Sequence, residues 1–438
     1  MSIPLDRLYH YIERTVENIH GDSVIIYRFF PHGSKKFTDL VPLHETVLSW
    51  KENKIRPQVF CNDQEPLNFD LYKHIPESQI PLSPVLTKIK EHGLTIPRKN
   101  FRLTTFVIWD GAVLLHSELR STEVEKYKNC DFFPAFYWSH AVIALDWFRY
   151  AEHVDQQKNN QKLFLIYARG WTGTREYRLK FLESIIKNQL HTDCQTTIQP
   201  VDPELSTHYR DHTFLKNVWK PTTVLENYFS TNSISSEFSA DFDLTDYETT
   251  EIEIVLETLF DDERLHFTEK ILRPLALGQP FILVASHGGL DYLKQYGFKT
   301  FSDVWSEDYD KIQDPEQRLQ AVVELMKSIK NWTHEQKTVH MEKARAIADY
   351  NKKRFFSKDF FTQVIDQLKS NLTSAINELQ NTNIGQTWVD IREKFKTNSV
   401  VQNELLKLRS QQDTDEIYDI VLEHRSRNLN KLSDQLPS

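Results

Sequence analysis

The chain has 438 residues, which is long for one hydrophobic core and predicts two domains with an appended segment. Its hydrophobic content of 39% and aromatic content of 12% are typical of a globular protein, and its net charge of −9 excludes a broad basic field for nucleic acid. Three scattered cysteines exclude a disulfide framework and a zinc knuckle, and they indicate buried thiols in a reducing compartment.

The first residues and the apolar runs predict the localisation. Met1 to Asp6 has no charged region followed by a long apolar region, so we expect no signal peptide. No apolar run approaches the length needed to span a bilayer. We therefore expect a soluble, cytoplasmic protein with no membrane partner.

The first part of the chain alternates predicted helices and strands. The predicted helices cover residues 5–19, 44–50, 84–92 and, rich in aromatic residues, 136–150. The predicted strands cover residues 23–30, 58–61, 104–109 and 112–116, the last two forming a hairpin around Asp110-Gly111. A polar stretch without periodicity, residues 155–161, marks a boundary, so we assign residues 1–157 to an N-terminal α/β domain.

A second α/β domain is predicted for residues 158–356. It begins with a buried strand, Leu163–Tyr167, followed by a glycine-containing loop and a helix over residues 175–187. An acidic loop covers residues 235–246. Near its end, Asp314-Pro315 predicts the N-terminus of another helix, with aspartate as the cap and proline at the first helical position.

Residues 357–438 are predicted to form a helical C-terminal extension. Its apolar seam is close to heptad spacing and consists of Phe361, Ile365, Leu368, Leu372 and Leu379. We expect this extension to pack on the body of the chain or on another subunit, which makes it a candidate surface for homo-oligomers.

The most informative stretch runs from Glu251 to Phe301. Alternating β-branched and acidic residues end at Glu257, a polar loop follows, and Thr268 opens an apolar-periodic helix that Gly278 and Pro280 end. A short apolar strand, 281–285, comes next. Strand, helix and buried strand form a βαβ unit, so the sequence predicts an α/β fold with two Rossmann-like, doubly wound domains facing a cleft.

Ionisable residues gather where such sheets bind ligands. Glu257 ends a strand, Glu269 and Lys270 begin a helix, and Arg175 begins an earlier one. A carboxylate can accept both hydroxyls of a ribose, and cations near helix N-termini neutralise phosphates, so this set suits a nucleotide diphosphate. An ordinary surface helix start is the alternative. The chain has no P-loop, no G-x-G-x-x-G, no G-x-S-x-G and no H-E-x-x-H.

The same stretch resembles the donor-binding motif of the α-1,3-fucosyltransferases. The similarity covers about fifty residues and rests on Glu257, the run Phe267-Thr268-Glu269-Lys270, Arg273, and the run from Leu275 to Ile282. Thr258 stands where that family usually has Asn. The whole chain also resembles glycosyltransferases of tailed phages, through Asp63-Gln64-Glu65-Pro66-Leu67 and Tyr137-Trp138-Ser139-His140.

The resemblance implies a glycosyltransferase of the GT-B type, with the nucleotide sugar on the C-terminal domain and the acceptor on the N-terminal one. Glu269 would hold the ribose, Lys270 the diphosphate, and Arg175 the phosphate of the leaving group. Glu257 and Thr268 would complete the donor site. The donor would be a GDP- or UDP-linked sugar, a co-substrate rather than a cofactor, and no metal would be required.

An inverting transferase needs a general base on the acceptor side. The candidates follow predicted strands of the N-terminal domain: Asp63, Glu65 and Glu118. For each of these carboxylates, a structural role as the cap of a helix or turn is an equally good explanation. His140 is better explained as a core histidine, and the acidic run Asp261-Asp262-Glu263 as a solvated loop than as a metal site.

The leading hypothesis is therefore an inverting, metal-independent transfer of a sugar from a nucleotide sugar to an acceptor hydroxyl. The acceptor would be a glycan or a hydroxylated base in phage DNA, and DNA would require a local basic groove. From a different class of protein, the alternative is a non-catalytic binding or assembly protein that retains this fold.

Overall fold

A computed structural model describes most of the chain from residue 112 to residue 381 and a few short segments before it. The described residues are 14, 26–29, 59–62, 66–67, 112–128, 132–154, 156–159, 161–202, 206–214, 219–231 and 242–381. They divide into two compact units. Unit 1 contains residues 117–121 and 138–367, and unit 2 contains the described residues before 117, residues 122–137, and those from 368 onwards.

Unit 2 contains a sheet of four parallel strands, in the order β1-β2-β3-β4. The strands are β1 (Ile26–Phe29), β2 (Val59–Asn62), β3 (Ala112–His116) and β4 (Phe132–Phe136), with helix α6 (Thr122–Lys128) between the last two. Strands β1 and β3 lie within predicted strands, and β2 extends one residue beyond the predicted range 58–61. The hairpin prediction is not supported for residues 112–116, because β3 pairs in parallel with β2 and β4, while residues 104–109 lie outside the described part.

Strand β4 and helix α6 were not predicted from the sequence. Residues 136–150 were assigned to one helix, but Phe136 ends β4 and helix α7 covers only Ser139–Trp147. Pro134 lies in the middle of β4. Because proline is rare in strands, residue propensities do not predict a strand here. Pro134 is tolerated because β4 is the edge strand among the described strands of this sheet, where a residue without an N–H group leaves no described neighbouring strand unpaired.

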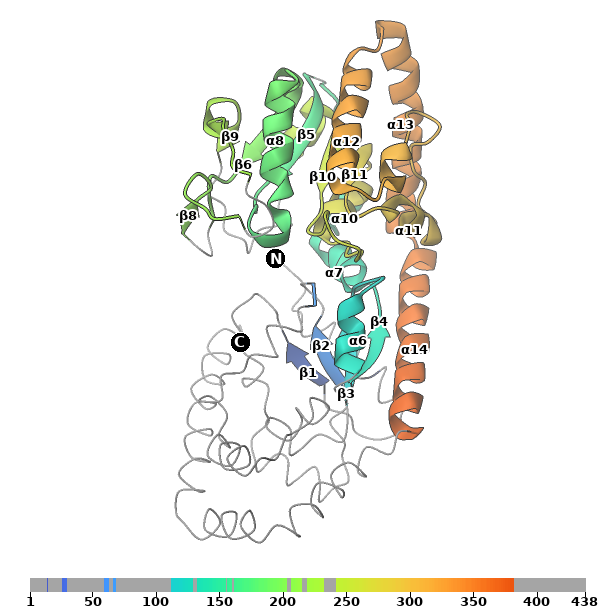
Figure 1. Ribbon diagram of the computed structural model, residues 1–438. Helices are drawn as coiled ribbons and strands as arrows, with labels where there is room; N and C mark the ends of the chain where they lie inside the picture. The colour runs from blue at the N-terminus through green and yellow to red at the C-terminus, as the bar shows by residue number, and fades with distance from the viewer. Residues whose placement is uncertain are drawn as a thin grey trace, which may run out of the picture. The chain divides into compact units, whose positions relative to one another are not determined.

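Unit 1 is built on a sheet of five parallel strands, in the order β11-β10-β5-β6-β9 (Figure 1). The strands are β5 (Lys162–Ala168), β6 (Cys194–Ile198), β9 (Ser230–Thr231), β10 (Thr250–Leu256) and β11 (Phe281–Val284). Numbered by their order along the chain, they follow the sequence 3-2-1-4-5, that of a doubly wound fold. Every residue of β10 and β11 is buried, as expected for strands of a parallel sheet that helices cover on both faces.

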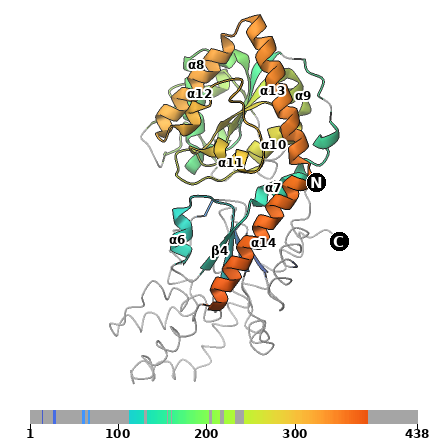
Figure 2. The same ribbon diagram turned by 90° about the vertical axis from the view of Figure 1, so that its right-hand side faces the viewer.

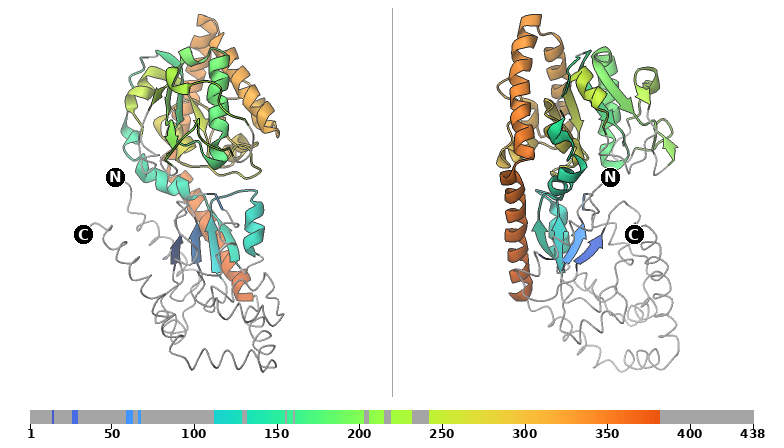
Figure 3. Two further views of the ribbon diagram at one scale, coloured as in Figure 1. Left: turned by 60° about the vertical axis from the view of Figure 1, so that its left-hand side comes forward. Right: turned by 180° about the vertical axis from the view of Figure 1, so that it is seen from behind.

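Helices cover both faces of this sheet (Figure 2, Figure 3). Helices α8 (Tyr177–Lys187) and α12 (Pro315–Lys330) lie side by side on one face. The other face carries α9 (Leu244–Thr249), α10 (Glu269–Leu277) and α13 (His334–Phe355), the last two in contact. Shorter elements complete the unit, namely η4 (Ala151–His153), η5 (Gly173–Arg175), η6 (His191–Asp193), β7 (Val201–Asp202), β8 (Thr207–His208), η7 (Leu225–Asn227), α11 (Gly289–Gln295) and η9 (Asp308–Lys311).

The boundaries of α10 and α12 follow the predicted signals. Thr268 caps α10, and Gly278 ends it in the left-handed region with φ 69°. Asp314 caps α12 through a bond from the Gln317 amide to its carboxylate at 2.8 Å, and Pro315 occupies the first helical position. The predictions for both helix starts are confirmed.

The described part of the C-terminal extension is one helix, α14 (Lys358–Asn381). Ile365, Leu368 and Leu372 are buried as predicted, but Phe361 is 38% exposed, and Phe360 takes its place against aromatic rings of unit 1. The buried positions lie mostly four residues apart, which is the spacing of a single straight helix packed on its own chain. The side chain of Leu379 lies outside the described part. No helix in the described ranges is both long and apolar enough to cross a membrane.

Candidate functional site

The candidate site lies at the carboxyl ends of β5 and β10. Strand β5 lies between β6 and β10 in the sheet. The chain first forms β6 beside one edge of β5 and later forms β10 beside its other edge. In doubly wound folds the two loops after such strands separate at this point and leave a crevice that binds ligands. Here those loops are residues 169–174 and residues 257–268. All the described side chains discussed below belong to unit 1.

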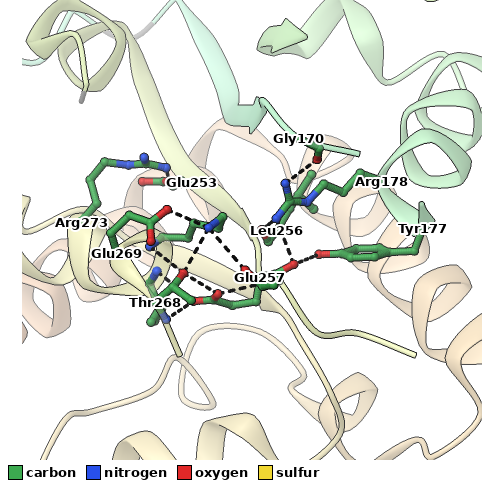
Figure 4. A network of polar contacts seen from close by, with 12 residues as sticks. Gly170, Tyr177, Arg178, Glu253, Leu256, Glu257, Thr268, Glu269 and Arg273 are labelled. Atoms are coloured by element: carbon green, nitrogen blue, oxygen red, sulfur yellow. Dashed lines mark hydrogen bonds and ion pairs between the residues drawn. The ribbon is translucent and has the colours of Figure 1, made fainter. Parts of the chain in front are cut away.

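Glu257 follows β10 directly and has no exposed surface. One carboxylate oxygen accepts hydrogen bonds from the amides of Thr268 and Ile271, both at 3.2 Å. The other accepts from the Thr268 hydroxyl at 2.8 Å and the Thr258 amide at 3.2 Å (Figure 4). Burial raises the pKa of this carboxyl group, and the nearby Lys270 ammonium opposes that rise. Glu257 therefore holds the first turn of α10 in place, and both of its carboxylate oxygens are engaged by groups of the chain itself.

Glu269 and Lys270 form an ion pair at the start of α10. The Lys270 ammonium lies 2.7 Å from a Glu269 carboxylate oxygen and 3.2 Å from the Thr268 hydroxyl. The Lys270 side chain is 20% exposed, whereas that of Glu269 is nearly covered. Burial alone would raise the pKa of Glu269, but the Lys270 ammonium holds this pKa well below its usual range. A reachable cation and an ionised carboxylate thus lie together at the end of β10.

Arg175 ends the short helix η5 and folds back over the loop after β5. A Cβ atom placed on Gly170 would lie 3.2 Å from Nη1 of Arg175 and 3.9 Å from Nη1 of Arg178. Gly170 is therefore the position at which both guanidinium groups approach the main chain closely. This places Arg175 and Lys270 at the ends of the two neighbouring strands β5 and β10.

Sequence reasoning missed Arg178 and gave no role to Tyr177. Arg178 is buried and donates to the carbonyl oxygens of Gly170 at 2.5 Å and of Leu256 at 2.7 Å, so that it bridges the ends of β5 and β10 (Figure 4). The Tyr177 hydroxyl donates to the Glu257 carbonyl oxygen at 2.7 Å. The available signal was spacing, because Arg178 follows Arg175 by three residues in the helix predicted for residues 175–187.

Among the general-base candidates, only Glu118 is described; Asp63 and Glu65 lie outside the described residues. The buried carboxylate of Glu118 pairs with Arg264 at 3.1 Å and accepts a hydrogen bond from Ser121. Next to it, Leu119 and Leu265 form an isolated antiparallel bridge. These contacts favour the structural alternative for Glu118, that of holding the loop that leads to Thr268.

Arg273, part of the sequence motif, does not lie at the site. Its guanidinium group pairs with the buried Glu253 at 2.7 Å, donates to the Tyr247 hydroxyl at 2.8 Å, and stacks over the ring of Tyr167. Arg273 therefore attaches α10 to the sheet from within the core.

The acidic loop after β10 is partly neutralised. Asp262 pairs with Arg264 at 2.8 Å. In the part of the chain that the structure describes, no group of three or more histidine, cysteine, aspartate or glutamate side chains is arranged to hold a metal ion.

Two buried histidines lie behind the Glu269–Lys270 pair. The rings of His140 and His266 meet edge to face, with centroids 5.3 Å apart. The main chain of Ser117 faces His266, but neither ring nitrogen of His266 reaches hydrogen-bond geometry with a described residue. Burial lowers the pKa of His140 to about 4, and burial with the neighbouring His140 lowers that of His266 well below its usual range. Both imidazoles are therefore neutral in the folded chain, and His140 is the core histidine that the sequence predicts.

This pair makes stability depend on pH. The unfolded histidines bind protons below about pH 6.5, whereas the folded ones do not, so the free energy of unfolding should fall as the pH drops from about 6.5 to 4. For His140 alone the loss is on the order of 3 kcal/mol. His266→Phe, which keeps the aromatic packing, should make this fall shallower. Urea titrations of both proteins across this range measure the slopes, and equal slopes would contradict the assignment.

No protein-family model and no curated protein matches the chain. The candidate site therefore rests on the geometry of unit 1 and on the motif that the sequence carries.

Proposed function

We propose that the chain is a glycosyltransferase that moves a sugar from a nucleotide-sugar donor to an acceptor hydroxyl. The observation that carries this proposal is the Glu269–Lys270 pair at the start of α10, beside the ends of β5 and β10, where the strand order changes direction. The pair offers a carboxylate for ribose hydroxyls and a cation for phosphate on adjacent residues. The GT-B arrangement of two facing domains is part of the proposal.

Each cation has a role in this reaction. The diphosphate of the donor would lie between Lys270 and Arg175, which follow the ends of neighbouring strands. When the bond between sugar and phosphate breaks, negative charge develops on the leaving nucleoside diphosphate, and fixed cations stabilise that charge. The reaction would then be metal-independent, with Lys270 and Arg175 supplying the positive charge.

The acceptor half of the reaction is proposed in outline. An inverting transfer needs a carboxylate that removes the proton of the acceptor hydroxyl on the face opposite the leaving group. Asp63 and Glu65 remain the candidates for this base, because Glu118 is ion-paired with Arg264. A glycan and a hydroxylated base in DNA both present such a hydroxyl.

The test is incubation of the full chain with UDP- and GDP-linked sugars, first with water as the only acceptor and then with glycans or DNA containing hydroxylated bases. We expect release of UDP or GDP, measured by chromatography, and a mass gain of one sugar on the acceptor. Binding of a nucleotide sugar without release under any condition would support the non-catalytic alternative. Neither binding nor release with the whole panel would overturn the proposal.

A further inference from the structure

Arg178 combines full burial with the lack of an anionic partner. It is 2% exposed, and no carboxylate among the described residues lies within ion-pair distance of it. Its three hydrogen bonds go to the carbonyl oxygens of Gly170, Leu256 and Glu257, at 2.5, 2.7 and 3.1 Å. Its Nε–H is buried and has no partner in the described part of the chain. Burying a cation that only neutral groups solvate is costly, so this position calls for an explanation.

The alternatives within the fold do not require a charge at this position. The Tyr177 hydroxyl already binds the Glu257 carbonyl oxygen at 2.7 Å, which shows that a neutral donor can secure the end of β10. Elsewhere in unit 1, the buried Arg273 has a carboxylate partner, Glu253, at 2.7 Å. The buried Arg318, like Arg178, binds carbonyl oxygens, but there the Nε–H is also bonded, to Ala285 at 3.1 Å, whereas the Nε–H of Arg178 is not. Burial lowers the pKa of Arg178, and the neighbouring Arg175 lowers it further, which opposes the attraction of Glu257. The guanidinium group of Arg178, which stays charged, therefore adds one positive charge where the ends of β5 and β10 meet.

We propose that Arg178 is a positioning residue that selects the charge of the ligand: its buried guanidinium group makes the crevice prefer a diphosphate over a neutral or singly charged group. The inference rests on the proposed function for the ligand and its location, and adds the residue that makes the site select for the charge of that ligand. Arg178 does not touch the ligand, since it is covered. It acts through its electric field, whereas Arg175 and Lys270 reach the phosphates. In a low-dielectric environment one fixed charge contributes strongly to the binding of a dianion and little to that of a neutral group.

The test compares a series of ligands of increasing charge: a nucleoside, its monophosphate, its diphosphate, and inorganic pyrophosphate. Binding to the full chain is measured by calorimetry at about pH 6.5. Arg178→Gln should lower the affinity for the diphosphate and for pyrophosphate by at least about tenfold, or about 1.4 kcal/mol, and leave that for the nucleoside nearly unchanged. Arg178→Lys, which keeps the charge, should restore most of the preference.

One variant provides a matched control. Lys180→Gln removes another cation of α8, whose ammonium pairs with Glu316 of α12 at 3.0 Å. It should leave the ratio between diphosphate and nucleoside affinities unchanged. Equal losses for all ligands in Arg178→Gln would show that the side chain only clamps the main chain, and would overturn the inference.

The remaining outcomes are also decisive. If Arg178→Gln does not fold, Arg178→Lys carries the test, because a buried lysine loses its charge between about pH 6.5 and 9.5 while arginine keeps it. The ratio between the diphosphate and nucleoside affinities of Arg178→Lys, divided by the same ratio for wild type, must then fall over that pH range. A quotient that stays constant overturns the inference. If wild type binds diphosphates and Arg178→Gln binds them equally well, only the inference fails. If wild type binds none of the ligands, the proposed function fails with it.

Discussion

Replacing Lys270 with methionine is expected to lower kcat/KM for nucleotide-sugar hydrolysis or transfer by about 10²–10³-fold, the usual cost of removing one preorganised group that stabilises developing charge. The Lys270 ammonium is a partly exposed cation among oxygen atoms at the end of β10, and it lies 3.5 Å from the Thr258 hydroxyl and 3.2 Å from that of Thr268. Steady-state release of the nucleoside diphosphate measures the effect.

Two controls separate chemistry from folding in this experiment. Lys294→Met removes a lysine that forms a comparable pair, with Asp291 at 3.0 Å, on the exposed surface of α11, and it should leave kcat/KM within about twofold of wild type. Lys270→Met also leaves Glu269 without its cation, so the double variant Lys270→Met with Glu269→Gln tests whether a lost fold explains lost activity. Full activity in a folded Lys270→Met protein would refute the role given to Lys270.

Removing Arg273 is expected to produce the largest loss of stability, about 3–5 kcal/mol, because it leaves the buried Glu253 carboxylate without a cation. The pair is part of a closed network in which the Tyr247 hydroxyl donates to Glu253 at 2.6 Å and accepts from Arg273 at 2.8 Å. Urea denaturation of Arg273→Met measures this loss, and adding Glu253→Leu should recover most of it, since an apolar pair of similar volume replaces the charges.

Arg345→Met is the matched control for the Arg273 experiment. Arg345 also pairs with a buried glutamate, Glu251, at 2.7 Å, but its own side chain is 41% exposed and Lys337 lies 3.9 Å from the same carboxylate. Its replacement should cost no more than about 1 kcal/mol. A similar cost for Arg273→Met would show that the buried network is not what attaches α10 to the sheet.

The sequence predicted the strands and helices of unit 1 best where local signals were unambiguous. Thr268 and Gly278 bounded α10, and the apolar run 281–285 contained β11, because caps and buried strands depend on nearby residues. Strand β4 was missed because Pro134 is acceptable only at a sheet edge, which is a tertiary property. The exposed position of Phe361 has a similar cause, since packing on the chain's own body selected Phe360 instead.

In the candidate site, too, the features that depend on neighbouring residues were predicted, and those that depend on tertiary packing were not. Glu269 and Lys270 were identified from their place at a helix start, and the structure places them at the end of β10. The burial of Glu257 under the first turn of α10 could not be seen, because it depends on how residues 257 and 268–271 fold onto each other. Arg178 was missed for the same reason: its partners are carbonyl oxygens 8 and 78 residues away in the chain, which no motif records.

The measurement that tests the account most directly is calorimetric titration of the full chain with UDP and GDP, each followed by competition with inorganic pyrophosphate. The account predicts that at least one nucleoside diphosphate binds in the micromolar range, that pyrophosphate competes with it, and that Lys270→Met weakens both by at least about tenfold. Absence of binding by either nucleotide at millimolar concentration, or binding that Lys270→Met leaves unchanged, would contradict it.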